Sequence, residues 1–158
     1  METTLSSREL IQLAIEREKT SYALYSCAAV MAVSSKVKGV FNRIARDELV
    51  HLLTLLRNFA RLYPELIEEV NIIMPVPEEA AVEKLAAVEE SAEALLCAIQ
   101  EEYESLQFYI QLARVVEDQE ARMALQTIIR DESNHVKALK SLEGDKIEET
   151  DVQEKAFH

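Results

Sequence analysis

Two segments of the sequence share one pattern: RDELVH at residues 46–51 and RDESNH at residues 130–135. In each segment a glutamate stands three positions before a histidine, which gives the pairs Glu48 and His51, and Glu132 and His135. On an α-helix, residues three positions apart lie on the same face, so each pair presents a carboxylate and an imidazole to one point. The repeated pattern therefore predicts two helices that carry the same polar feature.

The repeat extends beyond these two segments. Residues 14–21 (AIEREKTS) match residues 98–105 (AIQEEYES) at four positions, including Glu18 and Glu102. Tyr25 and Tyr109 also match, and every one of these pairs is separated by 84 positions. We interpret the chain as a tandem duplication of one helix pair, in which each half supplies two glutamates and one histidine to the same kind of site.

The composition favours a single all-α domain. A chain of 158 residues is long enough to bury one complete core without disulfide bonds. It contains only two glycines and three prolines, whereas the turn-rich sequences of β proteins need many more. Alanine, leucine and glutamate, which favour helices, are abundant instead.

Apolar stripes with helical spacing predict four long helices. The first begins near Ser6, where Ser6 and Glu9 form a capping box, and runs to about residue 33. The second carries its stripe from residue 37 to 59 and ends before Pro64. The third and fourth carry their stripes over 95–116 and 125–139. We expect an antiparallel four-helix bundle in which the six glutamates and histidines of the repeat face inward.

The connections are less regular. Residues 64–77 hold all three prolines and the apolar residues 72–74, so we expect a long crossover packed along the bundle, followed by a short helix over 78–88. Gly144 is expected to stop the last helix. We therefore place the bundle domain at residues 1–144 and a polar tail at 145–158, which is either disordered or a terminal helix.

Carboxylates gathered in a core require a counter-charge. Four buried glutamates would repel one another, and each would cost several kcal/mol unless it is protonated or neutralised. Two divalent cations remove the conflict, so we expect the metal ligands to be Glu18, Glu48, His51, Glu102, Glu132 and His135. Carboxylate and imidazole ligands suit iron, manganese or zinc. The alternative is that the histidines are ordinary core residues and the glutamates lie on the surface, but all six positions fall on inward stripes.

Several classes of function are disfavoured. A net charge of −12 argues against nucleic acid as a partner. The N-terminus resembles no signal peptide and no apolar stretch is long enough to span a membrane, so we expect a cytoplasmic protein that does not bind membranes. Cys27 and Cys97 lack the Cys-x-x-Cys spacing of a zinc, iron–sulfur or rubredoxin site, and we expect both to be buried, reduced thiols.

These motifs resemble the rubrerythrin-like branch of the ferritin-like superfamily of carboxylate-bridged diiron proteins. The resemblance covers about residues 6–142 and includes Tyr22 and Tyr25 after Glu18. It implies a ferritin-like bundle that holds two iron ions, with Glu48 and Glu132 bridging them. It further implies that Glu18 and Glu102 are terminal ligands and that each iron receives one histidine.

The resemblance also suggests residues that support the ligands. Asp47 and Asp131 would each accept a hydrogen bond from the histidine of the opposite helix. The alternative is that they face solvent. Tyr22, Tyr25 and Tyr109 are expected near the ligands, and the last two would hydrogen-bond to the terminal glutamates or to another acceptor in the core.

The chain departs from its relatives in three ways. It lacks the rubredoxin domain with four cysteines that rubrerythrins carry, so electrons would come from another protein. Ser105 stands where those relatives have an additional carboxylate. Leu49 stands where haem-binding bacterioferritins have a methionine, so haem is not expected.

The function expected from this resemblance is a non-haem diiron oxidoreductase that reduces peroxide or dioxygen and protects the cell from oxidants. A ferroxidase that handles or stores iron, a non-catalytic metal-stabilised module and diiron chemistry on an organic substrate remain alternatives. We expect a homodimer, in which helix pairs could be exchanged between chains through residues 64–90.

Overall fold

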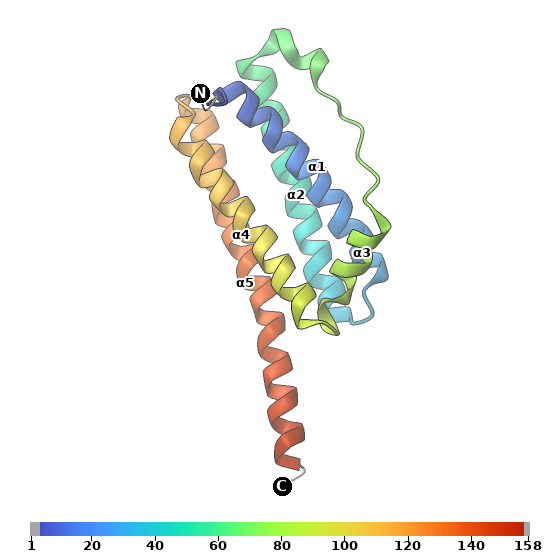
Figure 1. Cartoon of the computed structure of the whole chain (residues 1–158). Coiled ribbons are helices and arrows are strands. Elements are labelled where there is room, and N and C mark those ends of the chain that lie inside the picture. Colours follow the sequence, from blue (N-terminus) through green and yellow to red (C-terminus); the bar gives the residue numbers. More distant parts are fainter. Residues whose placement is uncertain (1–3, 157–158) are drawn as a thin grey trace.

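The predicted four-helix bundle is confirmed. The computed structural model describes residues 4–156, and the side chains of residues 4–143. The four long helices are α1 (Ser7–Met31), α2 (Ser35–Leu62), α4 (Ala92–Val115) and α5 (Gln119–Ala156) (Figure 1). The short elements are α3 (Glu79–Ala86) and two 3₁₀ helices, η1 (Pro64–Glu69) and η2 (Ala87–Glu89). Residues 4–156 contain no β-strand.

Each long helix begins next to a side chain that accepts a hydrogen bond from its first turn. The hydroxyl of Ser6 accepts from the backbone N–H of Glu9, whose carboxylate accepts from the backbone N–H of Ser6, as the capping box predicts. The residues that cap the other three helices are Ser34, Ser91 and Asp118. Local sequence therefore fixes where all four helices begin.

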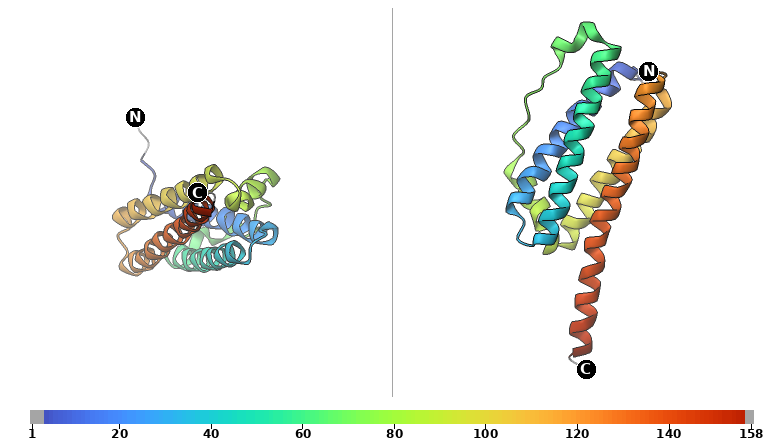
Figure 2. Two further views of the ribbon diagram at one scale, coloured as in Figure 1. Left: turned by 90° about the horizontal axis from the view of Figure 1, so that it is seen from below. Right: turned by 180° about the vertical axis from the view of Figure 1, so that it is seen from behind.

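The helices form two antiparallel pairs. α1 packs along α2, and α4 packs along α5; the pairs meet mainly where α2 faces α5, whereas α1 and α4 approach each other less closely (Figures 1 and 2). Two apolar clusters fill the interior, one around Phe41 and Leu95 and the other around Phe59 and Ile128. On every long helix the buried glutamates and histidines lie between the residues of these two clusters.

The crossover between the pairs runs back along α1 (Figure 1). Val70 and Met74 pack against the apolar cluster around Phe59. Ile72 and Ile73, by contrast, are 72% and 75% exposed, so only part of the predicted apolar contact forms. The ammonium of Lys19 donates a hydrogen bond of 2.6 Å to the carbonyl oxygen of Asn71 and so ties the crossover to α1.

The expected stop at Gly144 is wrong. α5 continues through this residue to Ala156 and extends beyond the ends of the other three long helices (Figures 1 and 2). A glycine inside a helix costs about 1 kcal/mol relative to alanine, which is not enough to end a helix by itself. The division between a bundle domain and a tail at residue 144 stays a prediction.

The expected burial of both cysteines is also wrong. Cys27 is exposed and Cys97 is partly exposed, although both are free thiols as predicted. Cys27 lies on the solvent side of α1, next to the buried Ala28. In the part of the chain that the structure describes, no helix is both long and apolar enough to cross a membrane.

Candidate metal centre

All six predicted ligand residues come together halfway along the bundle. α1 supplies Glu18, α4 supplies Glu102, and α2 and α5 each supply one Glu-x-x-His pair. None of the six residues is more than 4% exposed. Such complete burial of glutamates is rare unless their charge is compensated.

The ligand atoms form two overlapping groups. The first comprises Glu18, Glu48, His51 and Glu132, and the second comprises Glu48, Glu102, Glu132 and His135. Each residue offers one oxygen or nitrogen, and within each group these atoms lie within 4.8 Å of one another. Glu48 and Glu132 belong to both groups, so the arrangement has two centres joined by two shared carboxylates.

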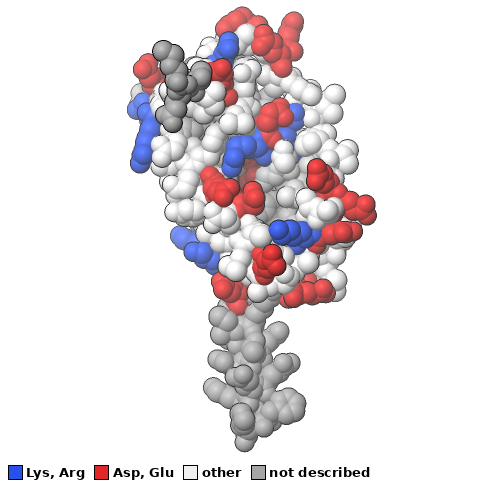
Figure 3. Space-filling view, in the orientation of Figure 1, with Lys and Arg blue, Asp and Glu red and all other residues white. Residues whose placement is uncertain are grey.

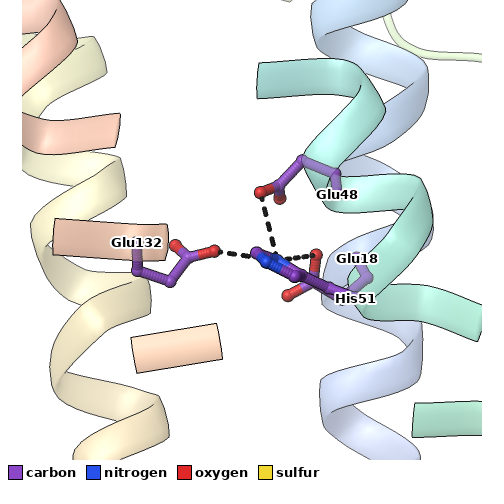
Figure 4. Close-up of side chains that lie close together, drawn as sticks. All are labelled: Glu18, Glu48, His51 and Glu132. Atoms are coloured by element: carbon purple, nitrogen blue, oxygen red, sulfur yellow. Dashed lines mark ion pairs between the residues drawn. The ribbon is translucent and has the colours of Figure 1, made fainter. Parts of the chain in front are cut away.

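In the first group, the carboxylates surround one nitrogen of His51 (Figure 4). His51 Nδ1 lies 3.4 Å from Glu132 Oε1 and 3.6 Å from Glu18 Oε2 and from Glu48 Oε1. Two ligands that each stand about 2.1 Å from a common ion lie roughly 3 to 3.5 Å apart. The spacing of these atoms therefore suits a metal ion between them.

The second group repeats this geometry. His135 Nδ1 lies 3.3 Å from Glu48 Oε1 and 3.5 Å from Glu102 Oε2. The centroids of the two imidazole rings are 6.0 Å apart. Each histidine therefore directs its Nδ1 at the carboxylates of its own group.

The other nitrogen of each ring contacts an aspartate of the opposite half. His135 Nε2 lies 3.0 Å from Asp47 Oδ2, and His51 Nε2 lies 3.1 Å from Asp131 Oδ2. An Nε2–H that donates to a carboxylate fixes the ring and leaves Nδ1 with its lone pair for a metal. These contacts are the ones that the resemblance implied for Asp47 and Asp131.

Two tyrosines also contact a glutamate of the opposite half of the chain. The hydroxyl of Tyr109 donates a hydrogen bond to Glu18 Oε1. The hydroxyl of Tyr25 lies beside Glu102, and burial together with that carboxylate raises the pKa of Tyr25. Tyr22 is different, because its ring is only partly buried and packs against the apolar cluster around Phe41. Within the described part of the chain, Tyr22 makes no hydrogen bond to a ligand residue.

Crowding perturbs the pKa values of the carboxyl groups in the metal-free protein. Burial and the neighbouring Glu48 raise the pKa of Glu132 to about 8, and the same two causes raise the pKa of Glu18. Burial would also raise the pKa of Glu48, but the two histidines outweigh burial and lower it. Without a metal, protons must therefore supply part of the positive charge that the centre needs.

Several polar atoms of the centre have no hydrogen-bond partner within the protein. Buried polar atoms without a partner are rare in native structures, and each requires an explanation. The site atoms without a partner are Glu18 Oε2, Glu48 Oε1, His51 Nδ1, Glu102 Oε2, both carboxylate oxygens of Glu132, and His135 Nδ1. These are the atoms that face the interior of the two groups, so two divalent metal ions fit the residues present.

A cavity of about 560 Å³ adjoins the centre where α1 and α4 stand apart. Its lining includes Glu18, Glu48 and Glu102. The sequence does not predict this cavity, because its existence depends on the distance between two helices. The repeat could have indicated which residues line it, since Ser21 and Ser105 occupy equivalent positions and both line the cavity.

Comparison with protein families decides the identity of the fold and the type of site. The family model described as Rubrerythrin matches residues 9–143, which is most of the chain. The chain belongs to the rubrerythrin family. Its ferritin-like bundle is confirmed, and the buried glutamates and histidines of this rubrerythrin-family protein fit a site of the diiron-carboxylate type. No curated protein and no solved structure matches the chain.

Proposed function

We propose that this rubrerythrin-family protein is a diiron oxidoreductase that reduces peroxide or dioxygen. The observation that carries the proposal is the pair of buried ligand groups that share Glu48 and Glu132. A site that joins two metals through common carboxylates suits a reaction that needs two electrons at once, whereas one structural ion would need only one such group.

Each ligand residue has a distinct role in this proposal. Glu18 and His51 would hold one iron, Glu102 and His135 would hold the other, and the two shared glutamates would contribute to both. A pair of ferrous ions would supply the two electrons that a peroxide O–O bond needs to be cleaved. The protein supplies geometry: Asp47 and Asp131 orient the imidazoles, and Tyr109 holds one oxygen of Glu18.

The identity of the metal and the electron donor belong to the same proposal. Iron is chosen over manganese or zinc because of the family, since the ligand types suit all three metals. The chain has only two cysteines, too few for a rubredoxin site, so we propose that a separate protein donates electrons. We also propose that the protein acts in the cytoplasm as a homodimer.

The first test is metal content followed by reaction with peroxide. Protein purified without oxygen should contain two iron ions per chain by elemental mass spectrometry. One equivalent of hydrogen peroxide should oxidise both ferrous ions and produce the ultraviolet absorption of an oxo-bridged ferric pair. Two zinc ions that persist after iron reconstitution, with no response to peroxide, would overturn the proposal in favour of a structural metal site.

A double variant tests the shared ligands. Glu48→Ala combined with Glu132→Ala should abolish binding of both ions, because each ligand group loses two of its four members. Glu93→Ala with Glu104→Ala is the matched control, because it removes the same charge from exposed positions. If the first double variant retained two metal equivalents, the assignment of the ligands would be wrong.

A further inference from the structure

The cavity beside the metal centre is much larger than hydrogen peroxide or dioxygen requires. Its volume is about 560 Å³. A water molecule, which is similar in size to either oxidant, occupies about 30 Å³ in the liquid. Cavities of roughly 300 to 1,000 Å³ are the usual size of sites for organic ligands. The volume therefore points to a substrate with an organic part.

The floor and the walls of the cavity differ in polarity. Glu18, Glu48 and Glu102, which are almost completely buried, form its floor. Buried or partly buried residues form the walls, which are mainly apolar: Leu24, Leu85, Ala94, Cys97 and Ala98, with the hydroxyl groups of Ser21 and Ser105. The cavity thus combines a polar floor with walls that suit an apolar group.

The internal repeat explains why the cavity lies here. Ser21 and Ser105 occupy equivalent positions in α1 and α4, as do Leu13 and Cys97, and all four residues line the cavity. Several of the side chains that α1 and α4 direct into it are small. Because these side chains cannot fill the space between the two helices, the cavity remains open down to the carboxylates.

The charges around the cavity favour a neutral ligand. Glu16 and Glu101 line its exposed part, and three buried carboxylates form its floor, against Arg17 and Lys84. The guanidinium of Arg17 lies 4.7 Å from the centroid of the Phe108 ring, and this cation–π contact positions the side chain. In Figure 3, acidic and basic side chains are scattered over this face among uncharged ones, without a basic patch that would attract anions.

We propose that this cavity binds the organic group of an alkyl hydroperoxide and places its O–O bond at the metal centre. The inference rests on the proposed peroxidase function and names its substrate class. A hydroperoxide is neutral at physiological pH, and its polar end would face the carboxylate floor. Its alkyl or aryl group would lie against Leu24, Leu85 and Ala98.

The reaction balances with the electrons that the proposed centre holds. Cleavage of the O–O bond of the hydroperoxide would take up two electrons, which a ferrous pair held by the six ligand residues would supply. Two protons from solvent complete the products, which are the corresponding alcohol and one water molecule. The external electron donor then returns the two electrons.

Binding can be tested without redox chemistry. Zinc-loaded protein should bind cumyl alcohol, the product of cumene hydroperoxide, with a saturable signal in calorimetry or NMR titration. Cys97→Phe should weaken this binding strongly, because the larger ring takes up part of the apolar space in which the ligand's organic group would lie. Leu96→Phe is the matched control, since Leu96 is 57% exposed and does not line the cavity. Ser105→Leu fills the cavity from a second position, in case Cys97→Phe does not fold.

Reactivity provides the second measurement. In single turnovers of the diferrous protein, Cys97→Phe should lower the ratio of the rate constants for cumene hydroperoxide and hydrogen peroxide by about tenfold or more. Leu96→Phe should leave this ratio unchanged. Retention of two metal ions by each variant would show that the centre itself is intact.

The two proposals fail in different ways. If zinc-loaded protein does not bind cumyl alcohol, or if both cavity-filling variants bind it as the unmodified protein does, the inference about the cavity is overturned while a hydrogen peroxidase remains. If the iron-loaded protein reduces neither peroxide, the proposed function is overturned. A change in oligomeric size caused by the cavity-filling variants, with no binding of the alcohol, would instead identify this face as a contact between chains.

Discussion

At the scale of single residues, Asp47 and Asp131 determine which nitrogen each histidine offers to a metal. We expect Asp47→Ala to lower the affinity for one metal ion about 10- to 100-fold, because the His135 ring loses the acceptor that fixes its tautomer. Competition with a coloured chelator would measure the change. Asp47→Asn keeps an oxygen acceptor and should lose less affinity. Equal affinity in Asp47→Ala and the unmodified protein would show that the contact between Asp47 and His135 does not contribute to metal binding.

Asp118 gives a prediction for the dependence of stability on pH. Its carboxylate accepts hydrogen bonds from the Ala121 backbone N–H at 2.8 Å and from Arg61 at 2.5 Å. Arg61, followed by the backbone N–H of Ala121, lowers the pKa of Asp118 from 3.8 to about 2. Because the folded-state pKa is the lower one, this contribution to stability is complete above about pH 4 and is lost as the pH falls through about 2.

The matched variant for this prediction is Asp118→Asn, which keeps an oxygen for the cap but removes the charge. Urea unfolding of the metal-free protein should show a small difference in stability from Asp118→Asn at pH 7. The difference should shrink between pH 4 and pH 2. A difference that stays constant over this range would mean that the charge of Asp118 does not contribute.

At the scale of elements, Lys19 ties the crossover to α1. Its ammonium lies 2.6 Å from the carbonyl oxygen of Asn71 and 3.1 Å from Glu16 Oε1, and the residue is 2% exposed. We expect Lys19→Met to keep the packing of the aliphatic stem but to destabilise the protein by about 1 to 2 kcal/mol. Proteolysis within residues 70–77 should become faster. Lys38→Met, at an exposed position of α2, should change neither measurement.

Some elements were predictable because their signals are local. The capping box at Ser6 and the proline after Tyr63 mark the start of α1 and the end of α2, and the structure has both boundaries there. The start of α4 is set by Ser91, which stands four residues before Leu95, where the predicted stripe begins. That cap was missed because Ala94 stands three residues after Ser91, so the capping-box glutamate that marks the start of α1 is absent. The prediction at Gly144 failed because a glycine permits a helix to end but does not require it, and α5 continues through this position.

At the scale of the whole molecule, the metal centre joins the two halves of the bundle. We expect metal removal at neutral pH to lower the thermal midpoint, because the buried carboxylates then depend on protons for compensation. A metal present at 100 times its dissociation constant stabilises the fold by about 2.7 kcal/mol. Calorimetry of the apo and metal-loaded forms would measure the shift. An apo protein that melts no lower than the loaded form would argue against ions in the core.

The gathering of the six ligand residues could be predicted, but the cavity could not. Each Glu-x-x-His pair follows from helix periodicity, and the offset of 84 positions relates the two halves. The cavity depends on how far α1 stands from α4, which results from packing between all four helices. The exposure of Cys27 was predictable, because Cys27 stands two positions from both Tyr25 and Ala29 and so lies on the side of α1 opposite the apolar stripe.

The crossed contacts between the halves have a consequence for the ancestry of the protein. Each ligand group takes three members from one half of the chain and one from the other, and the supporting aspartates and tyrosines cross in the same direction. A single helix pair could complete such a group only by meeting a second copy of itself. The arrangement is therefore the one that a symmetric dimer of a half-length ancestor would have had. In a chain that joins two such halves, each half can change separately, and the opposite charges at the equivalent positions Arg17 and Glu101 are one departure from the symmetry.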